Sequence, residues 1–310
     1  MTRVYVDGSA GTTGLQILDR LGARDDLTIM KASESLRKDP AYRREMIGSA
    51  DIVFLCLPDD AAREAALWAE NTGARLIDTS TAHRTDPEWV YGFPELSGQK
   101  ERIRNARRVA NPGCHASGFI ALVRPLVEQG LIGADSQLTA FSLTGYSGGG
   151  KKMIAGYEAG GRSPLFDAPR MYGLSQQHKH LPEMISLCGL ETAPVFCPIV
   201  ASYYSGMEVT VPLFAGQFRG TPGDVADCYR AYYTDGWVRY LDSDEEGFLS
   251  ANALSGCDEM AVTVRGNAER LLLVARFDNL GKGACGAAIQ NMNLMTGADE
   301  DTGLIRMEDI

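Results

Sequence analysis

The segment VANPGCHASGF, residues 109–119, holds a cysteine in a setting suited to nucleophilic chemistry. The sequence NPG is typical of a turn, and residues 115–128 have the apolar spacing of an amphipathic helix. Cys114 is therefore expected at a helix N-terminus, where exposed peptide N–H groups and the helix dipole stabilise a thiolate. The same N–H groups can bind the oxyanion formed when a thiolate attacks a carbonyl. From position alone, a buried structural cysteine is an equally good interpretation.

A glycine-rich segment, GSAGTTG, follows a strand-like run at residues 3–7 and precedes an amphipathic run at residues 15–21. Such glycines permit a tight turn and close approach to a pyrophosphate, whose charge a helix N-terminus stabilises. The spacing is GxxGxxG rather than GxGxxG, so a ligand-free strand–helix turn is the alternative. The residues expected to bind a dinucleotide here are Gly8, Ser9, Gly11, Thr12, Thr13 and Gly14.

The loop KASESLRKD, residues 31–39, follows the second predicted strand and bears on the choice of cofactor. It offers the hydroxyls of Ser33 and Ser35 and the cation of Arg37, with Glu34 as an acidic residue. An acidic residue at the end of this strand favours NAD, whereas hydroxyls with cations suit a 2′-phosphate. These residues therefore predict NADP(H), and an ordinary solvated loop is the alternative.

Two further segments carry cations that suit an anionic substrate. Arg84 follows DTSTAH at the end of a predicted strand, where parallel sheets bind ligands, and a guanidinium can grip phosphate or carboxylate in a bidentate manner. A surface salt bridge is the alternative role. The segment GYSGGGKK fits the P-loop pattern GxxxxGK, but Lys152 stands where a P-loop needs Ser or Thr, which argues against an NTPase. Its glycine-rich turn with Lys151 can still cradle an acyl phosphate.

The composition excludes several classes of function. The 310 residues carry a net charge of -10 without a Lys/Arg block, which argues against nucleic acid or an anionic membrane as partner. The seven cysteines form no CxxC pair, so no metal site is predicted. No signal-peptide pattern and no apolar stretch of membrane-spanning length is present, and we expect free thiols in a reducing cytoplasm.

The first 115 residues alternate between strand-like and helix-like patterns, which predicts an α/β fold with a Rossmann-like, doubly wound parallel sheet. The predicted strands are residues 3–7, 27–32, 51–57 and 75–78, and the predicted helices are residues 15–21, 40–47 and 59–70.

Beyond residue 117 the pattern changes to β-branched or alternating runs with helices between them. The strand-like runs are residues 138–144, 207–213, 260–264 and 271–277. They predict an α+β domain on a mainly antiparallel sheet. Residues 284–295 are helical in pattern and expected to return to the first domain, and the tail of residues 296–310 is expected to be partly loose. The predicted domains are thus residues 1–116 plus 284–310 and residues 117–283.

Together with the N-terminal glycine loop, NPGCHASG resembles the nucleophile segment of the N-acetyl-γ-glutamyl-phosphate reductases of arginine biosynthesis. These are related to the aspartate-semialdehyde dehydrogenases and, more distantly, to the glyceraldehyde-phosphate dehydrogenases. Further matching segments are DTSTAHR, YGFPEL, GYSGGGKK, HKHLPEM and DNLGKGACGAAIQNMNLM. The resemblance spans residues 8–295, and the length and the GYSGGGK form resemble the short (type 2) subgroup.

The resemblance implies roles for further residues. It places the catalytic histidine in HKHLPEM, with His180 favoured and His178 in reserve. By contrast His115, which follows Cys114, is expected to point elsewhere, as a surface or capping residue. The implied nicotinamide-side residues are Asn279 and Gly281, and the implied substrate-binding residues are Ser80, Arg84, Asn111 and Lys151. A glyceraldehyde-phosphate dehydrogenase-like second domain is implied as well.

The implied activity is NADPH-dependent reductive dephosphorylation of N-acetyl-γ-glutamyl phosphate to N-acetylglutamate semialdehyde through a thioester on Cys114. Three alternatives stay open: the same chemistry on aspartyl phosphate, a cysteine hydrolase, and a non-catalytic NADP-binding sensor. Relatives associate through the sheet of the second domain, which implies a homo-dimer or tetramer.

Overall fold

The computed structural model describes residues 1–234 and 236–309, apart from the side chain of Thr12. It divides into two compact units. The first comprises Met1–Pro94, Gly98–Pro112 and Ala284–Leu304, and the second comprises Glu95–Ser97, Gly113–Gly283 and Ile305–Ile310. Relative to the predicted boundaries, residues 113–116 and the tail beyond residue 304 lie in the second unit, so Cys114 belongs to the second unit.

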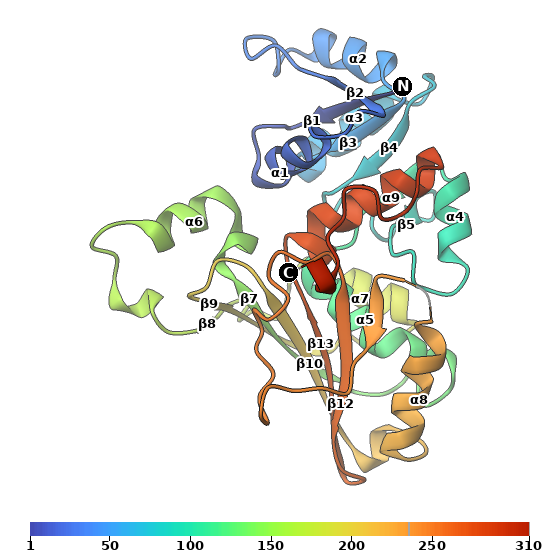
Figure 1. Ribbon diagram of the computed structural model, residues 1–310, viewed down its shortest axis with the longest axis vertical. Helices are drawn as coiled ribbons and strands as arrows, with labels where there is room; N and C mark the ends of the chain where they lie inside the picture. Colours follow the sequence, from blue (N-terminus) through green and yellow to red (C-terminus); the bar gives the residue numbers. More distant parts are fainter. Residues whose placement is uncertain (235, 310) are drawn as a thin grey trace. The chain divides into compact units, whose positions relative to one another are not determined.

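The first unit is built on a parallel sheet of six strands in the order β2-β1-β3-β4-β6-β5 (Figure 1). The strands are β1 (Thr2–Asp7), β2 (Leu27–Met30), β3 (Ile52–Leu55), β4 (Arg75–Asp78), β5 (Val90–Tyr91) and β6 (Arg108–Ala110). The helices are α1 (Thr12–Leu21), α2 (Pro40–Ser49), α3 (Asp59–Trp68), α4 (Gln99–Asn105) and α9 (Gly286–Thr296). The predicted Rossmann-like sheet is confirmed.

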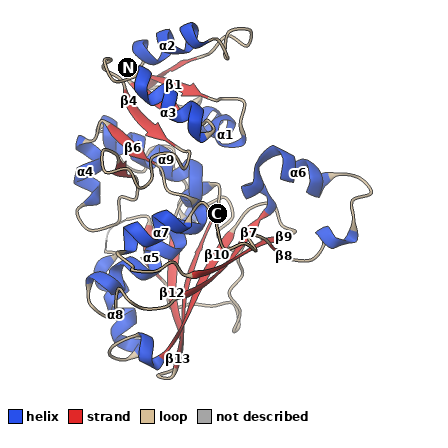
Figure 2. Cartoon of the chain, turned by 180° about the vertical axis from the view of Figure 1, so that it is seen from behind, coloured by secondary structure: helices blue, strands red, loops and turns tan. Residues whose placement is uncertain are grey.

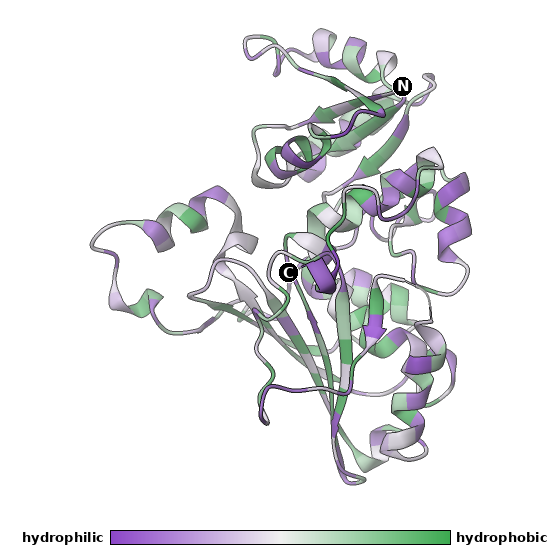
Figure 3. Cartoon of the chain, viewed as in Figure 1, coloured by the Kyte–Doolittle hydropathy of each residue, from purple (hydrophilic) through white to green (hydrophobic). Residues whose placement is uncertain are grey.

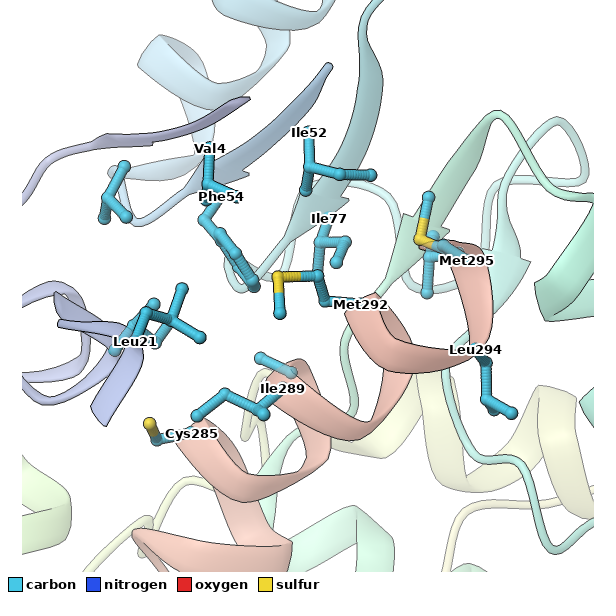
Figure 4. Close-up of a cluster of buried hydrophobic side chains, with 14 of the residues drawn as sticks. Val4, Leu21, Ile52, Phe54, Ile77, Cys285, Ile289, Met292, Leu294 and Met295 are labelled. Atoms are coloured by element: carbon cyan, nitrogen blue, oxygen red, sulfur yellow. The ribbon is translucent and has the colours of Figure 1, made fainter. Parts of the chain in front are cut away.

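Helix α9, although close to the C-terminal end of the chain, contributes to the core of the first unit. Its Ile289 and Met292 pack with Val4, Phe54 and Ile77 of three neighbouring strands in one buried cluster (Figure 4). The strands here are mostly hydrophobic whereas α4 is largely hydrophilic (Figure 3). Burial of apolar surface, worth about 25 cal/mol per Å², therefore draws the C-terminal helix back onto the first sheet.

The second unit is built on a mixed sheet in the order β11-β12-β13-β10-β7-β9-β8 (Figure 2). The strands are β7 (Thr139–Gly145), β8 (Arg170–Met171), β9 (Val195–Ala201), β10 (Met207–Phe214), β11 (Val238–Tyr240), β12 (Met260–Gly266) and β13 (Arg270–Phe277). The helices are α5 (Cys114–Glu128), α6 (Gly150–Glu158), α7 (Leu181–Cys188) and α8 (Pro222–Tyr232). The run β12-β13-β10-β7 is antiparallel, while β11–β12 and β7–β9 pair in parallel. The predicted mainly antiparallel sheet is confirmed.

Helices α5 and α8 pack on one face of this sheet, with α7 against α5 (Figures 1 and 2). Along β10, buried residues alternate with partly exposed ones, so the second face is not covered to the same extent. Large apolar side chains remain on that face, with Phe141 40% exposed and Val195 55% exposed.

The tail beyond residue 304 is anchored rather than loose. The backbone N–H of Ile305 donates to Asp258 Oδ2 at 2.8 Å, and that of Met307 donates to Glu259 Oε2 at 2.7 Å. Glu259 is fully buried and also pairs with Arg306. The expectation of a loose tail is wrong because buried carboxylates, which the sequence pattern does not show, accept its backbone donors. Within the described part of the chain, no helix combines the length and apolarity needed to span a membrane.

Candidate active site

Cys114 is the first residue of α5, and Gly113 caps the helix with an extended backbone. The first N–H groups of an α-helix have no intrahelical acceptor, so they are the donors predicted to face a developing oxyanion. The thiol is partly exposed. A Cβ at position 283 would lie 3.0 Å from the Cys114 Cβ, so the backbone of Gly283 packs closely against the cysteine. Glycine at 283 therefore leaves room for Cys114.

Glu183, in the first turn of α7, links this helix start to the histidine segment. Its side chain is 1% exposed, and its Oε2 accepts the N–H of Gly113 at 3.2 Å. Its Oε1 lies 3.9 Å from Nε2 of His180, the residue that caps α7. Sequence reasoning did not assign Glu183 a role. The available signal was its position three residues after His180, which places the two side chains on one side of a helix start.

The two predicted histidines lie together with a third. The ring centroids of His178 and His180 are 4.8 Å apart, and each lies 5.6 Å from the ring of His115. Nδ1 of His178 accepts the backbone N–H of His180 at 3.2 Å, so the neutral imidazole carries its proton on Nε2. Burial, assisted by the charge of Lys179, lowers the pKa of His178 to about 4. This imidazole is therefore neutral near pH 7.

His115 is not a surface or capping residue, and that expectation is wrong. It is 3% exposed, with Nδ1 2.6 Å from Ser142 Oγ and Nε2 2.6 Å from Tyr172 Oη. Burial, with smaller contributions from His178 and Lys179, lowers its pKa to about 3. The physical reason is that α5 is buried around most of its circumference, so its second position faces the sheet rather than solvent. The exposure of a helix start depends on the elements that pack around it, and the local sequence does not show those elements.

In the first unit, the glycine loop adopts a conformation that two of its glycines require. Gly8 has φ +87°, and a Cβ there would lie 2.2 Å from the carbonyl oxygen of Cys56. A Cβ on Gly14 would lie 2.7 Å from the carbonyl oxygen of Gly8, which also accepts the N–H of Gly11 at 3.0 Å. Gly11 caps α1, which begins at Thr12 and continues through Thr13. The loop thus delivers a helix N-terminus to the carboxyl end of β1, where a pyrophosphate is expected to bind.

A hollow of about 340 Å³ lies beside this loop and is lined by Gly8, Ser9, Arg37 and Lys38, among others. Ser33 and Ser35 belong to the same exposed loop as Arg37, with their hydroxyl oxygens 3.0 Å apart. The structure thus brings Arg37 to the glycine loop, as expected for a nucleotide site. It also brings Arg43 of α2, a residue that sequence reasoning missed.

The predicted substrate residues of the first unit cluster at the ends of β4 and β6. Arg84 is 9% exposed and donates from Nε to the carbonyl of Asn111 and from Nη2 to that of Thr79. Ser80 donates its hydroxyl hydrogen to Asp78 Oδ2 at 2.8 Å. The amide of Asn111 donates to the carbonyl of Ala284. Arg84 is therefore held by backbone carbonyls at the carboxyl ends of two parallel strands.

The remaining predicted residues lie in the second unit. Asn279 accepts the N–H of Gly206 through Oδ1 at 2.9 Å and donates from Nδ2 to Ser147 Oγ at 3.0 Å, so its amide supports the GYSGGG turn. At Gly281, a Cβ would lie 2.2 Å from the carbonyl oxygen of Cys257, which explains the glycine sterically. Lys151 is exposed at the start of α6.

Comparison with known proteins identifies the family to which this chain belongs. Residues 3–106 match the NAD binding domain of semialdehyde dehydrogenases, and residues 114–279 match their dimerisation domain. An N-acetyl-gamma-glutamyl-phosphate reductase from Burkholderia lata is 45% identical over 95% of this chain and 96% of its own length. N-acetyl-gamma-glutamyl-phosphate reductase 2 from a Nostoc species is 42% identical over 97% of this chain and 99% of its own.

Among solved structures, aspartate semialdehyde dehydrogenase II from Vibrio cholerae superposes with a TM-score of 0.73 at 17% identity, covering 96% of this chain and 99% of that one. This likeness shows the fold. The sequence matches show more, and the chain belongs to the semialdehyde dehydrogenase family and, within it, to the N-acetyl-gamma-glutamyl-phosphate reductases.

Proposed function

We propose that this chain reduces N-acetyl-γ-glutamyl phosphate to N-acetylglutamate semialdehyde with NADPH, through a thioester on Cys114. The observation that carries the proposal is the placement of Cys114 as the first residue of α5, with its cap tied to Glu183 and thereby to His180. The full-length relatives with this name support the choice of substrate.

The chemistry begins with attack of the Cys114 thiolate on the acyl carbon. A C–S bond forms, the C–O bond to phosphate breaks, and inorganic phosphate leaves with the electron pair. The N–H groups at the start of α5 stabilise the tetrahedral oxyanion. After reduction of the thioester to a thiohemiacetal, the oxyanion collapses, the C–S bond breaks and the aldehyde leaves with the thiolate restored.

His180 is the acid/base in this proposal, with His178 as the second candidate. A base beside the sulfur takes the thiol proton before attack and returns a proton when the thiolate leaves. The carboxylate of Glu183 beside His180 stabilises the charged imidazole formed in between, as an orienting acid does in other nucleophile–base pairs.

The nicotinamide cofactor, when bound, supplies the hydride that reduces the thioester. The chain belongs to a family with an NAD binding domain, so a nicotinamide cofactor is used. We propose that Gly8, Ser9 and Gly11 hold its pyrophosphate with Thr12, Thr13 and Gly14. The preference for NADP rests on Arg37 and its neighbours Ser33 and Ser35. Asn279 and Gly281 are proposed on the nicotinamide side, where their own contacts fit a role in shaping the backbone.

Arg84 and Lys151 are proposed to bind the anionic groups of the substrate, with Ser80 and Asn111 shaping the site around Arg84. The backbone carbonyls of Asn111 and Thr79 fix the orientation of the Arg84 guanidinium at the carboxyl ends of β4 and β6. These cations act locally against the overall charge of -10.

We also propose a homo-oligomer that forms through the less covered face of the second sheet. The matched dimerisation domain and the exposed Phe141 and Val195 support this arrangement. The cytoplasmic location stays a prediction.

The test is phosphate-dependent reduction of NADP⁺ with N-acetylglutamate semialdehyde. Wild-type protein is expected to show activity that requires phosphate, with aspartate semialdehyde much the poorer substrate. Equal or better activity with aspartate semialdehyde contradicts the proposed substrate. Binding of NADP⁺ without any phosphate-dependent turnover favours the sensor alternative.

A further inference from the structure

A buried ion pair faces the nucleotide hollow of the first unit. Nη2 of Arg43 donates to Asp7 Oδ2 at 2.8 Å, and its Nε lies 3.1 Å and 3.2 Å from the two carboxylate oxygens. The side chain of Asp7 is 2% exposed and that of Arg43 is 10% exposed. Asp7 ends β1 directly before Gly8, and both members of the pair line the hollow.

The position of Asp7 makes its charge important for nucleotide choice. Asp7 is the acidic residue among the residues that line the hollow, and the charged lining residues besides Asp7 and Arg43 are Arg37 and Lys38. Asp7 ends β1 and so is not the acidic residue after the second strand that binds the ribose hydroxyls of NAD. Its charge acts through space instead, because a carboxylate that lines the same hollow repels a 2′-phosphate. An unmatched Asp7 would therefore act against the cations of the neighbouring loop.

The segment that supplies Arg43 also fixes this loop. The hydroxyl of Tyr42 accepts the backbone N–H of Ser33 at 3.1 Å, while Asp39 caps the helix by accepting the N–H of Tyr42. Tyr42 and Arg43, two successive residues of α2, thus hold the loop of residues 31–39 and neutralise Asp7. The guanidinium of Arg43 lies 4.8 Å from the centre of the Trp68 ring, which further fixes its plane.

We infer that Arg43 is a specificity-determining residue, which neutralises Asp7 so that the adenosine end of the hollow selects a ribose 2′-phosphate over a free ribose diol. The inference rests on the proposed use of NADP, and it adds a residue outside the loop that carries the direct phosphate ligands. Arg43 acts by removing a competing negative charge and by adding its own positive field to those of Arg37 and Lys38.

The experiment compares binding of adenosine 2′,5′-bisphosphate and adenosine 5′-monophosphate by calorimetry, because neither ligand needs the nicotinamide half of the site. The variant is Arg43→Met. The matched control is Arg44→Met, since Arg44 follows on the same helix and lies equally close to Trp68 but is exposed and does not line the hollow. Asp7→Asn with Arg43→Met removes both charges and avoids leaving a buried carboxylate without its partner.

Wild-type protein and Arg44→Met are expected to prefer the bisphosphate to the same extent. Arg43→Met is expected to lower this preference by about tenfold to a hundredfold, the size of a lost charge-assisted interaction. The double variant is expected to recover part of the preference, because the opposing carboxylate is gone. If Arg43→Met folds poorly, the double variant alone still tests the idea, as its preference should lie below that of the wild type.

A purely structural ion pair gives a different result. Arg43→Met and the double variant would then weaken both ligands equally and leave the preference unchanged, which overturns this inference while the proposed NADP use stands. A wild-type protein without any preference for the bisphosphate would overturn the proposed NADP use itself, and this inference with it.

Discussion

Replacement of Glu183 by glutamine tests whether this buried carboxylate acts through His180. The amide oxygen of glutamine can still accept the N–H of Gly113, so the start of α5 keeps its partner. The negative charge 3.9 Å from His180 Nε2 is lost. The substitution therefore separates the charge of Glu183 from its structural hydrogen bond.

The distance sets the expected size of the effect. Two unit charges about 4 Å apart interact by about 4 kcal/mol at an effective dielectric constant of about 20. Most of this stabilisation disappears in Glu183→Gln whenever the imidazole is charged, as it is between proton uptake and release. A loss of about 3 to 4 kcal/mol corresponds to a fall in kcat of about 100-fold to 1000-fold. The KM for the semialdehyde should change little, because the side chain of Glu183 is only 1% exposed and is therefore not expected to contact the substrate.

The assay is phosphate-dependent NADP⁺ reduction, with thermal unfolding measured in parallel. Glu191→Gln is the matched control, since Glu191 lies just beyond α7 and is exposed. Because Glu183 acts through His180, Glu183→Gln should have less than about a threefold effect in a His180→Asn background. A folded Glu183→Gln enzyme whose kcat stays within about threefold of the wild type would refute the reasoning.

Three further predictions follow from the geometry. Cys114→Ala should abolish phosphate-dependent reduction while NADP⁺ binding by calorimetry is kept, and retained turnover would contradict the thioester route. Gly8→Ala should weaken NADP⁺ binding at least tenfold and lower the free energy of unfolding by about 1–3 kcal/mol, because a Cβ would meet the carbonyl of Cys56 at φ +87°. The folded-state pKa values of His115 and His178, about 3 and about 4, lie below the unfolded value of 6.5, so the unfolded state binds more protons between those limits. Stability should be full above about pH 6.5 and fall as the pH drops towards 4; His115→Asn should reduce this slope in urea titrations, and an unchanged slope would contradict the assignment.

The elements that sequence reasoning predicted well are those whose pattern is local. Strand β3 is an uninterrupted apolar run, and α3 begins with two acidic residues, so both were predictable near their observed bounds. Cys114 was placed at a helix start because NPG before an apolar-periodic run is a local signal. Strand β9 was not predicted; it carries Pro198, a residue that argues against a strand, and it lies near the sheet edge with β8 beyond it.

The residues that sequence reasoning missed depend on partners far away in the chain. His115 meets Ser142 and Tyr172, 27 and 57 residues further along, and those contacts bury it. Glu183 meets Gly113 across 70 residues. The hydrophobic periodicity of a sequence does not show such pairings, because they form only when separate elements pack together.

Local sequence was enough to predict the alternation of strands and helices in the first 115 residues, the glycines that a phosphate-binding turn needs, and the cysteine at a helix start. These features follow from backbone geometry and from spacing within a few residues. Tertiary structure alone decided which polar groups face one another. It paired Arg43 with Asp7, set Glu183 beside His180 and buried His115. Charges and hydrogen bonds act over a few ångströms of space, and packing sets those distances for residues that are far apart in sequence.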